Sequence, residues 1–217
     1  ERGLGVPVIQ VADPRAVVPA LCANVYASPA TRLTTMAVTG TNGKTTTSYL
    51  MRAAIASRYP KASLCGTVET HVGPISFEAV RTTAEAPVIA RILAATEQYE
   101  CGAGIIELSA HALSLHRVDG IVFDVAAFTN LQHDHLDYYG DMENYFQAKA
   151  LLFTPEHSRR GVVCVDDEWG RRLAQQATVP VTTVSALTEE DADWQVRNVT
   201  PDQTIGRTVF TLVDPSG

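Results

Sequence analysis

The amino-acid sequence predicts an α/β fold with a doubly wound, mostly parallel sheet and a small antiparallel hairpin near the C-terminus. Short apolar segments alternate with longer segments of helical periodicity, the order expected of parallel strands joined by helices. One apolar segment, residues 36–38, runs into a glycine-rich turn that is followed at once by a helical pattern. Over residues 194–213 the pattern changes to strict alternation, which is typical of an antiparallel hairpin.

The composition indicates a folded globular protein and argues against several functions. The chain has 217 residues, of which 46% are hydrophobic, enough for a sizeable core. Its net charge of −7 argues against a nucleic-acid-binding surface but leaves room for a local basic pocket. No apolar run approaches the ~18 residues that a membrane span needs, so we expect no membrane segment.

The cysteines are expected to be unpaired. Cys22, Cys65, Cys101 and Cys164 lie far apart among apolar neighbours, without a CxxC pair. Buried free thiols are the simplest interpretation, and they fit a reducing cytoplasm. The N-terminus lacks the pattern of a signal peptide, so we expect a cytoplasmic protein.

The first part of the chain is predicted to be the tail of a truncated N-terminal domain, residues 1–32. Residues 6–11 alternate like a short strand, Asp13 is a typical helix cap, and residues 15–26 have an apolar helical face. One strand and one helix cannot form a core of their own. Residues 33–217 are predicted to be a nucleotide-binding domain.

The stretch around which the chain is organised is Met36 to Thr47, a strand, a glycine-rich turn and a helix in that order. Gly40 and Gly43 allow a tight turn whose N–H groups face an anion, and the helix start adds free donors and a positive dipole end. Lys44 can reach outer phosphates, and the Thr45 hydroxyl can ligate magnesium. A glycine turn that carries a lysine by chance is the alternative. The order of features favours a P-loop-type nucleotide triphosphate site, shortened because Val38 stands where such loops usually have glycine.

The remaining elements follow the same alternation. The loop leads into a helix over residues 45–56, whose apolar face would be formed by Leu50, Met51, Ala54 and Ile55. Further helices are expected at residues 87–99, 111–116, 142–153 and 168–177. Strands are expected at residues 62–67, 104–108, 121–128, 161–165 and 179–184, with a loop or hairpin at 69–80. The hairpin at 194–213 would belong to a small antiparallel sheet.

Polar side chains gather where the predicted parallel strands end. Ligands bind at the carboxyl ends of strands in such sheets, so we expect five residues to converge there: Lys44, Thr45, Glu107, Asp134 and His135. A carboxylate and an imidazole near a triphosphate suit divalent ions.

Each of these residues also has a plainer interpretation. Glu107 could cap the following helix, and His133 and His135 could be surface histidines. His111 and His116 would be structural. Lys149 has apolar neighbours on a helix, where a lysine usually snorkels to solvent, and spacing alone does not single it out.

Several motifs together resemble the Mur ligase family, the amide-forming enzymes of peptidoglycan precursor synthesis. The segment Thr39-Gly-Thr-Asn-Gly-Lys-Thr-Thr-Thr47 is similar to the ATP loop of that family. The other matching segments are Glu107-Leu-Ser-Ala-His111, His116-Arg117-Val118, Thr129-Asn-Leu, Asp134-His-Leu-Asp-Tyr138, Tyr145-Phe-Gln-Ala-Lys149 and Asp166-Asp167-Glu168 with Gly170-Arg171. In this order they look most like the MurE type, which adds the third amino acid to UDP-MurNAc-L-Ala-D-Glu.

The resemblance implies a reaction and a set of site residues. ATP phosphorylates the D-Glu side carboxylate, the amine of a free amino acid attacks the acyl phosphate, and phosphate leaves. The implied ATP-binding residues are Gly40, Thr41, Asn42, Gly43, Lys44, Thr45 and Thr46. The implied Mg²⁺ ligands are Thr45, Glu107, His135 and a carbamylated Lys149, and the implied catalytic residues are Lys44, Glu107, His135 and Lys149. The implied contacts of the UDP-MurNAc-dipeptide are Thr82, Thr83, Ser109 and Arg117.

The sequence departs from the family pattern on the substrate side. Arg81 stands where Asn is common, Ala84 replaces Pro, and Ala110 replaces the second Ser. Two alternatives therefore stay open: a folylpolyglutamate synthase-like ligase, and a nucleotide-binding relative without turnover. The resemblance implies that residues 33–217 are the family's central ATP-binding domain, incomplete at its C-terminal end. It also suggests a monomer, and we expect this chain to be inactive by itself because the family's outer domains lie outside it.

Overall fold

The computed structural model describes residues 5, 8–187, 191–202 and 206–216. Within them the strands form one ten-stranded sheet in the order β10-β9-β8-β7-β6-β1-β5-β2-β3-β4. The strands are β1 (Thr34–Thr39), β2 (Ser63–Cys65), β3 (Glu69–Val72), β4 (Ile75–Glu78), β5 (Ala103–Glu107), β6 (Val125–Phe128), β7 (Gly161–Cys164), β8 (Val181–Ser185), β9 (Trp194–Asp202) and β10 (Arg207–Val213). Six neighbouring strands from β8 to β2 pair in parallel, which confirms the predicted fold class.

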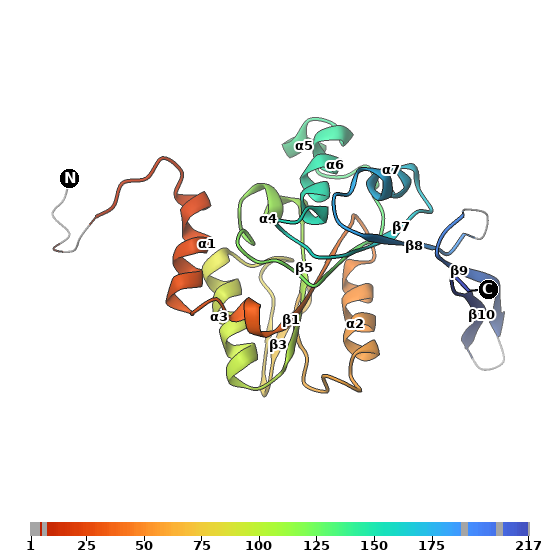
Figure 1. Ribbon diagram of the computed structural model, residues 1–217, viewed down its shortest axis with the longest axis horizontal. Helices are drawn as coiled ribbons and strands as arrows, with labels where there is room; N and C mark the ends of the chain where they lie inside the picture. The colour runs from red at the N-terminus through yellow and green to blue at the C-terminus, as the bar shows by residue number, and fades with distance from the viewer. Residues whose placement is uncertain (1–4, 6–7, 188–190, 203–205, 217) are drawn as a thin grey trace.

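Helices lie on both faces of this sheet, so it is doubly wound (Figure 1). The helices are α1 (Pro14–Val25), α2 (Lys44–Ala54), α3 (Ala86–Gln98), α4 (Ala110–Ser114), α5 (Leu136–Tyr139), α6 (Met142–Ala150) and α7 (Glu168–Gln176), with 3₁₀ turns at Pro29–Arg32 and Leu151–Phe153. α2 covers one face of the sheet, whereas α1 packs on α3 at the other. α4, α5 and α6 lie at the end of the sheet where β1 leads into α2 (Figure 1). In described parts of the chain, no helix is long and apolar enough to cross a membrane.

The centre of the sheet fixes where the polar strand ends meet. β1 lies between β5 and β6, and Val38 of β1 pairs with Glu107 of β5 while Thr39 pairs with Phe128 of β6. This register places the loop after β1 directly beside the ends of both neighbours. The polar convergence expected from chain order therefore has a geometric basis.

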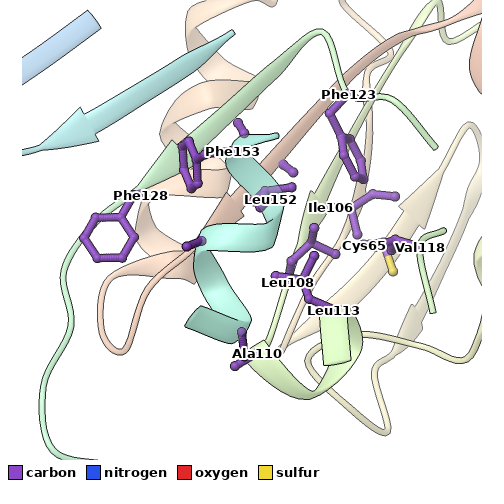
Figure 2. Close-up of a cluster of buried hydrophobic side chains, with 14 of the residues drawn as sticks. Cys65, Ile106, Leu108, Ala110, Leu113, Val118, Phe123, Phe128, Leu152 and Phe153 are labelled. Atoms are coloured by element: carbon purple, nitrogen blue, oxygen red, sulfur yellow. The ribbon is translucent and has the colours of Figure 1, made fainter. Parts of the chain in front are cut away.

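The hydrophobic core lies against the strands that carry the site. Ile106 and Leu108 from β5 and its end meet Leu113 of α4 and Leu152 of the turn after α6, and all four are nearly inaccessible to solvent (Figure 2). Burying an aliphatic side chain of this size contributes about 1.5–3 kcal/mol. The core therefore fixes the elements around the strand ends.

Three sequence predictions about local structure need correction. Residues 8–11 form no strand, and residues 6 and 7 lie outside the described part. The hairpin β9–β10 is not a separate sheet, because its first residues Trp194 and Gln195 pair in parallel with the end of β8 and extend the main sheet. Cys65 and Cys101 are buried, but Cys22 and Cys164 are only partly buried; all four are free thiols, as predicted.

The apolar face predicted for α2 is wrong in part, because Leu50 and Ala54 are exposed whereas Met51 and Ile55 are half-buried. Leu50 is 65% exposed, and the buried residue of this helix is Ser48. Residues two apart on a helix point about 200° apart, so the two side chains lie on opposite sides. The loop that precedes α2 sets the phase of the helix, and that phase turns Ser48 toward Glu107.

Candidate functional site

The glycine-rich loop has the backbone that the sequence predicts. Gly40 has a φ of +146° and Gly43 a φ of +82°, both in the region that favours glycine. A Cβ atom at Gly40 would lie 1.9 Å from the Thr129 Oγ1 atom, so no other residue fits there. Gly43 is the N-cap of α2 and makes no side-chain cap, which leaves the N–H groups at the helix start free to bind an anion.

The segment after β6 holds this loop in place. The Thr41 N–H donates to the Asn130 carbonyl at 2.9 Å, and the Asn42 N–H donates to the Asn130 Oδ1 atom at 3.0 Å. The Thr129 hydroxyl donates to the Asn42 carbonyl at 2.6 Å. Residues far apart in sequence thus fix the shape of the glycine-rich loop.

Lys44 folds back over the loop. Its Nζ atom donates to the carbonyl oxygens of Gly40 at 3.0 Å and Thr41 at 2.9 Å. Burial lowers the pKa of Lys44, while the negative charges of Glu107 and Asp134 act in the opposite direction. The ammonium group is therefore close to both acidic side chains that were expected at this edge.

Glu107 is a fully buried carboxylate held by hydroxyl groups. Its Oε2 atom accepts from the hydroxyls of Thr45 and Thr67, each at 2.9 Å, and its Oε1 atom lies 3.0 Å from the Ser48 hydroxyl. The carboxylate does not cap α4, because Ser109 does so. Among described residues it has no ion-pair partner within contact distance, and a buried carboxylate normally needs positive charge nearby.

Lys149 is buried rather than snorkelling. It is 1% exposed, its Nζ atom donates to the Gly40 carbonyl at 3.0 Å, and it lies 4.6 Å from the centre of the Tyr145 ring. Burial lowers the pKa of Lys149 to about 7, and the charge of Lys44 adds to that effect. The Lys149 amine is thus partly neutral near pH 7, which its apolar sequence neighbours did not indicate.

His135 lies at the open side of this group. Its ring lies 5.2 Å from that of His111 and 5.9 Å from that of Tyr145, which also contacts Lys149. The side chain is 48% exposed, and its Nε2 atom lies 3.5 Å from Asp134. His135 and the buried lysine therefore both neighbour the Tyr145 ring, and His135 is half open to solvent. Burial, and then the neighbouring His135, lower the pKa of His111.

A second group of predicted residues lies on the other side of Glu107. The Thr83 hydroxyl donates to the Glu107 carbonyl at 2.8 Å and accepts from the Ser109 N–H at 2.9 Å. Arg117 donates to the Thr83 carbonyl at 3.0 Å. The Thr82 hydroxyl lies 3.1 Å from that of Thr67. All four residues implied for substrate binding thus gather around the end of β5.

Sequence reasoning missed four contributors to this arrangement. Ser48 and Thr67 contact Glu107, while Arg15 and Glu85 complete a cluster with Arg117 in which the Glu85 carboxylate lies 3.5 Å from Arg15 and 3.0 Å from Arg117. The position of Thr67 at the end of a predicted strand could have identified it. Ser48 and Arg15 gave no local signal, because their roles depend on helix phase and packing.

Two of the predicted metal ligands, Thr45 and Glu107, are in contact, but the described residues do not form a complete coordination site. Within the described ranges, no three His, Cys, Asp or Glu side chains converge to hold a metal ion. Thr45 and Glu107 do present adjacent oxygen atoms beside the loop. Such oxygens suit magnesium, which prefers few protein ligands and phosphate oxygens.

The doubly wound sheet, the loop after β1 and the lysine that follows it define the class: an α/β protein of the P-loop type. A model of the Mur ligase middle domain matches residues 38–216. The chain belongs to the Mur ligase family.

Relatives with curated names agree with the MurE-type resemblance. UDP-N-acetylmuramyl-tripeptide synthetase of Leifsonia xyli subsp. xyli is 46% identical over 98% of this chain and 41% of its own length. The UDP-N-acetylmuramoyl-L-alanyl-D-glutamate--2,6-diaminopimelate ligase of Streptomyces coelicolor is 45% identical over 98% of this chain and 42% of its own length. The chain thus spans about two-fifths of the length of these relatives.

Solved structures share the fold. A structure of a UDP-N-acetylmuramoyl-L-alanyl-D-glutamate--2,6-diaminopimelate ligase matches with a TM-score of 0.80 and 27% identity, over 97% of this chain and 45% of its own. A Mycobacterium tuberculosis folylpolyglutamate synthase complexed with ADP matches with a TM-score of 0.70 at 17% identity, over 92% of this chain and 51% of its own. The second likeness concerns the fold alone.

Proposed function

We propose that this chain is the nucleotide-binding part of an ATP-dependent ligase that adds the third amino acid to UDP-MurNAc-L-Ala-D-Glu in peptidoglycan precursor synthesis. One observation carries the proposal: Lys44 and Lys149 meet at the Gly40 carbonyl, while Thr45 meets Glu107 beside them. The names of the two curated relatives support the substrate class. The identity of the third amino acid is left to experiment.

The proposed reaction has two steps. The D-Glu side carboxylate attacks the γ-phosphorus of ATP, a P–O bond breaks, and ADP leaves. The nitrogen of the incoming amino acid then attacks the acyl carbon. The bond to phosphate breaks, phosphate leaves, and the nitrogen loses a proton.

The loop residues would bind and orient ATP. The backbone N–H groups of residues 40–46 and the start of α2 suit the phosphates, because they supply free donors and a positive dipole end. Lys44 would exchange its bonds to two loop carbonyls for bonds to phosphate oxygens. Its charge would then lie where negative charge spreads during phosphoryl transfer.

Magnesium fits the pair of Thr45 and Glu107. The Glu107 carboxylate is buried among hydroxyl donors, without an ion-pair partner in the described chain, so a cation there would complete the charge balance. The bound ion would supply positive charge to the phosphoryl group being transferred. Thr45 and Glu107 would hold it, and the other two hydroxyls would keep Glu107 oriented.

A second magnesium ion would be held by His135 and a modified Lys149. A plain ammonium would repel a cation, so this role needs the carbamate. The pKa of the Lys149 amine is about 7, so this amine is partly neutral near neutral pH. The neutral nitrogen can attack the carbon of CO₂, forming a C–N bond while a proton passes to solvent. The nearby charge of Lys44 would favour the resulting anion.

The muramyl substrate would bind along Thr82, Thr83, Ser109 and Arg117. Arg117 is only 11% exposed, and among the described residues its buried Nε atom has no hydrogen-bond partner, which supports a polar ligand beside this side chain. Free thiols support a cytoplasmic location, and we propose a monomer with no nucleic-acid partner. The boundary at residues 32 and 33 remains a prediction.

The test is amino-acid-dependent phosphate release by the whole protein that carries this chain. It would be supplied with ATP, magnesium, UDP-MurNAc-L-Ala-D-Glu and one amino acid at a time. Release that depends on one amino acid supports the proposal and names the missing substrate. Lys44→Met should abolish release, whereas Lys61→Met, a change at an exposed lysine, should not. ATP binding without such release, or glutamylation of a folate, would contradict it.

A further inference from the structure

Thr67 is a single side chain that contacts both halves of the site. It directly follows Gly66 after β2, and its Oγ1 atom lies 2.9 Å from the Glu107 Oε2 atom and 3.1 Å from the Thr82 Oγ1 atom. Glu107 is on the proposed magnesium side, and Thr82 is on the proposed muramyl side. No role in nucleotide or substrate binding follows from the sequence for Thr67 itself.

The hydroxyl protons give these contacts a direction. A hydroxyl group has one proton to donate, and an ionised carboxylate can only accept. The Thr67 hydroxyl is the donor in both contacts, so its one proton is shared between the Glu107 carboxylate and the Thr82 oxygen. The result is a single donor that links the buried carboxylate to Thr82.

The backbone around Thr67 holds the hydroxyl in this place. The Gly66 N–H donates to the Glu69 carbonyl, and the Ala79 N–H donates to the Val68 carbonyl, each at 3.1 Å, so both ends of the β3–β4 hairpin are tied beside Thr67. A Cβ atom at Gly66 would lie 2.2 Å from the Glu107 Oε1 atom. The segment is therefore shaped to bring its backbone against Glu107.

A second connection runs in parallel through the neighbouring threonine. The Thr83 hydroxyl donates to the Glu107 carbonyl, so the segment that carries Thr82 is tied to Glu107 at both the backbone and the carboxylate. The backbone connection depends on Thr83, but the carboxylate connection depends on Thr67 alone. A change at Thr67 would thus remove one of the three hydroxyl contacts that orient the Glu107 carboxylate, while leaving the strand end in place.

We infer that Thr67 is a positioning residue that orients Glu107 toward the nucleotide and Thr82 toward the second substrate. This inference rests on the proposed function, because it assigns a ligand to each side. It predicts that one substitution outside the glycine-rich loop weakens binding at both sites. A residue with a merely local structural role would not affect two separate ligands.

The experiment measures two dissociation constants on the whole protein by calorimetry. One is for UDP-MurNAc-L-Ala-D-Glu without nucleotide or magnesium, and the other is for ADP with magnesium. Thr67→Val keeps the shape of the side chain but removes the hydroxyl, so we expect both constants to rise about three- to tenfold, the size of one hydrogen bond. Thr67→Ser keeps the hydroxyl and should stay within about twofold of the unchanged protein.

Comparison variants separate the two connections. Thr82→Val should weaken only the muramyl ligand, and the Thr67→Val/Thr82→Val double variant should lose less than the product of the single losses, because the two residues share one bond. Thr208→Val, at an exposed threonine of β10, is the matched control and should change neither constant. Thr67 is itself exposed, so equal thermal midpoints are expected for these variants.

Three results would overturn the inference. The first is a Thr67→Val effect on one ligand only or on neither. The second is equal losses for Thr67→Val and Thr67→Ser, which would assign the effect to packing. The third is that the unchanged protein binds ADP but not UDP-MurNAc-L-Ala-D-Glu. This result would contradict the proposed function as well, and it can be told apart because it occurs without any substitution.

Discussion

Lys44 and Lys149 donate to the same acceptor: the Nζ atom of each lies 3.0 Å from the Gly40 carbonyl oxygen. Two ammonium groups on one oxygen repel each other, and the more deeply buried one gives up its charge more readily. Lys149 is the buried partner, with a pKa lowered to about 7. The glycine-rich loop therefore lies against a lysine far away in sequence, whose pKa is lowered by burial and, to a smaller extent, by the charge of Lys44.

The stability of the protein should rise with pH because of Lys149. Its pKa is about 7 when folded and about 10.4 in an unfolded chain. Between these pH values the unfolded state binds a proton that the folded state does not. The contribution of Lys149 to the free energy of unfolding therefore grows as pH rises through this window and is lost as pH falls toward 7. The slope is at most about 1.4 kcal/mol per pH unit.

Urea unfolding midpoints at pH 7 and pH 8.5, in buffer free of CO₂, test this expectation. The midpoint should rise more for the unchanged protein than for Lys149→Met, which has no charge to lose. Lys61→Met is the matched control and should keep the full rise, since Lys61 is exposed. Equal pH dependence in the unchanged protein and Lys149→Met would show that Lys149 is an ordinary lysine.

Lys149 should form a carbamate. With ¹³C-bicarbonate, the unchanged protein should show a carbamate carbon signal by NMR that is absent from Lys149→Met and present in Lys61→Met. The signal should weaken as pH falls below about 7, because the amine must be neutral to react. A signal that survives in Lys149→Met would assign the modification to another amine.

Replacing Glu107 by Gln should remove most of the turnover while keeping the fold. The amide keeps the shape of the side chain but loses the negative charge that would hold magnesium. Loss of one preorganised electrostatic contact costs about 3 kcal/mol or more, so phosphate release should fall at least about 100-fold. Glu78→Gln, at an exposed position of β4, should leave the rate unchanged. Similar rates for the two variants would argue against a role for Glu107.

Gly66→Ala should displace the Glu107 carboxylate. The added Cβ atom would lie 2.2 Å from the Oε1 atom, and Gly66 does not have a positive φ, so the effect is steric rather than conformational. We expect a loss of about 1–3 kcal/mol in unfolding free energy, together with weaker binding of ADP and magnesium. Glu107→Asp shortens the acidic side chain beside the added Cβ atom. In the Gly66→Ala/Glu107→Asp double variant it should therefore offset part of the loss in unfolding free energy. Strictly additive losses would contradict this explanation.

Arg117 and Arg81 should contribute unequally to binding of the muramyl substrate. Arg117 is 11% exposed and bonds to Thr83, whereas Arg81 is 58% exposed and pairs only with Glu85 in the described contacts. Arg117→Gln should raise the dissociation constant about tenfold or more, and Arg81→Gln by less than about threefold. Calorimetry measures both, with Arg91→Gln as an exposed control. A larger effect at Arg81 would make its departure from the family pattern a determinant of specificity.

Sequence patterns were enough to predict the alternation of strands and helices, the glycine-rich loop and the polar residues at the strand ends. These features depend on neighbours in the chain: Gly40 and Gly43 set local backbone angles, and Asp13 caps its own helix. Family motifs then identified Lys149, which residue spacing did not.

Packing between distant segments, in contrast, fixed which side chains are buried and which of them come into contact. Ser48 rather than Leu50 faces the sheet, because the loop sets the phase of α2. Lys149 is buried because α6 packs over the loop, and Thr67 reaches Glu107 because the register of the sheet brings two strand ends together. Contacts across a sheet depend on packing between distant segments, which a pattern of near neighbours does not encode.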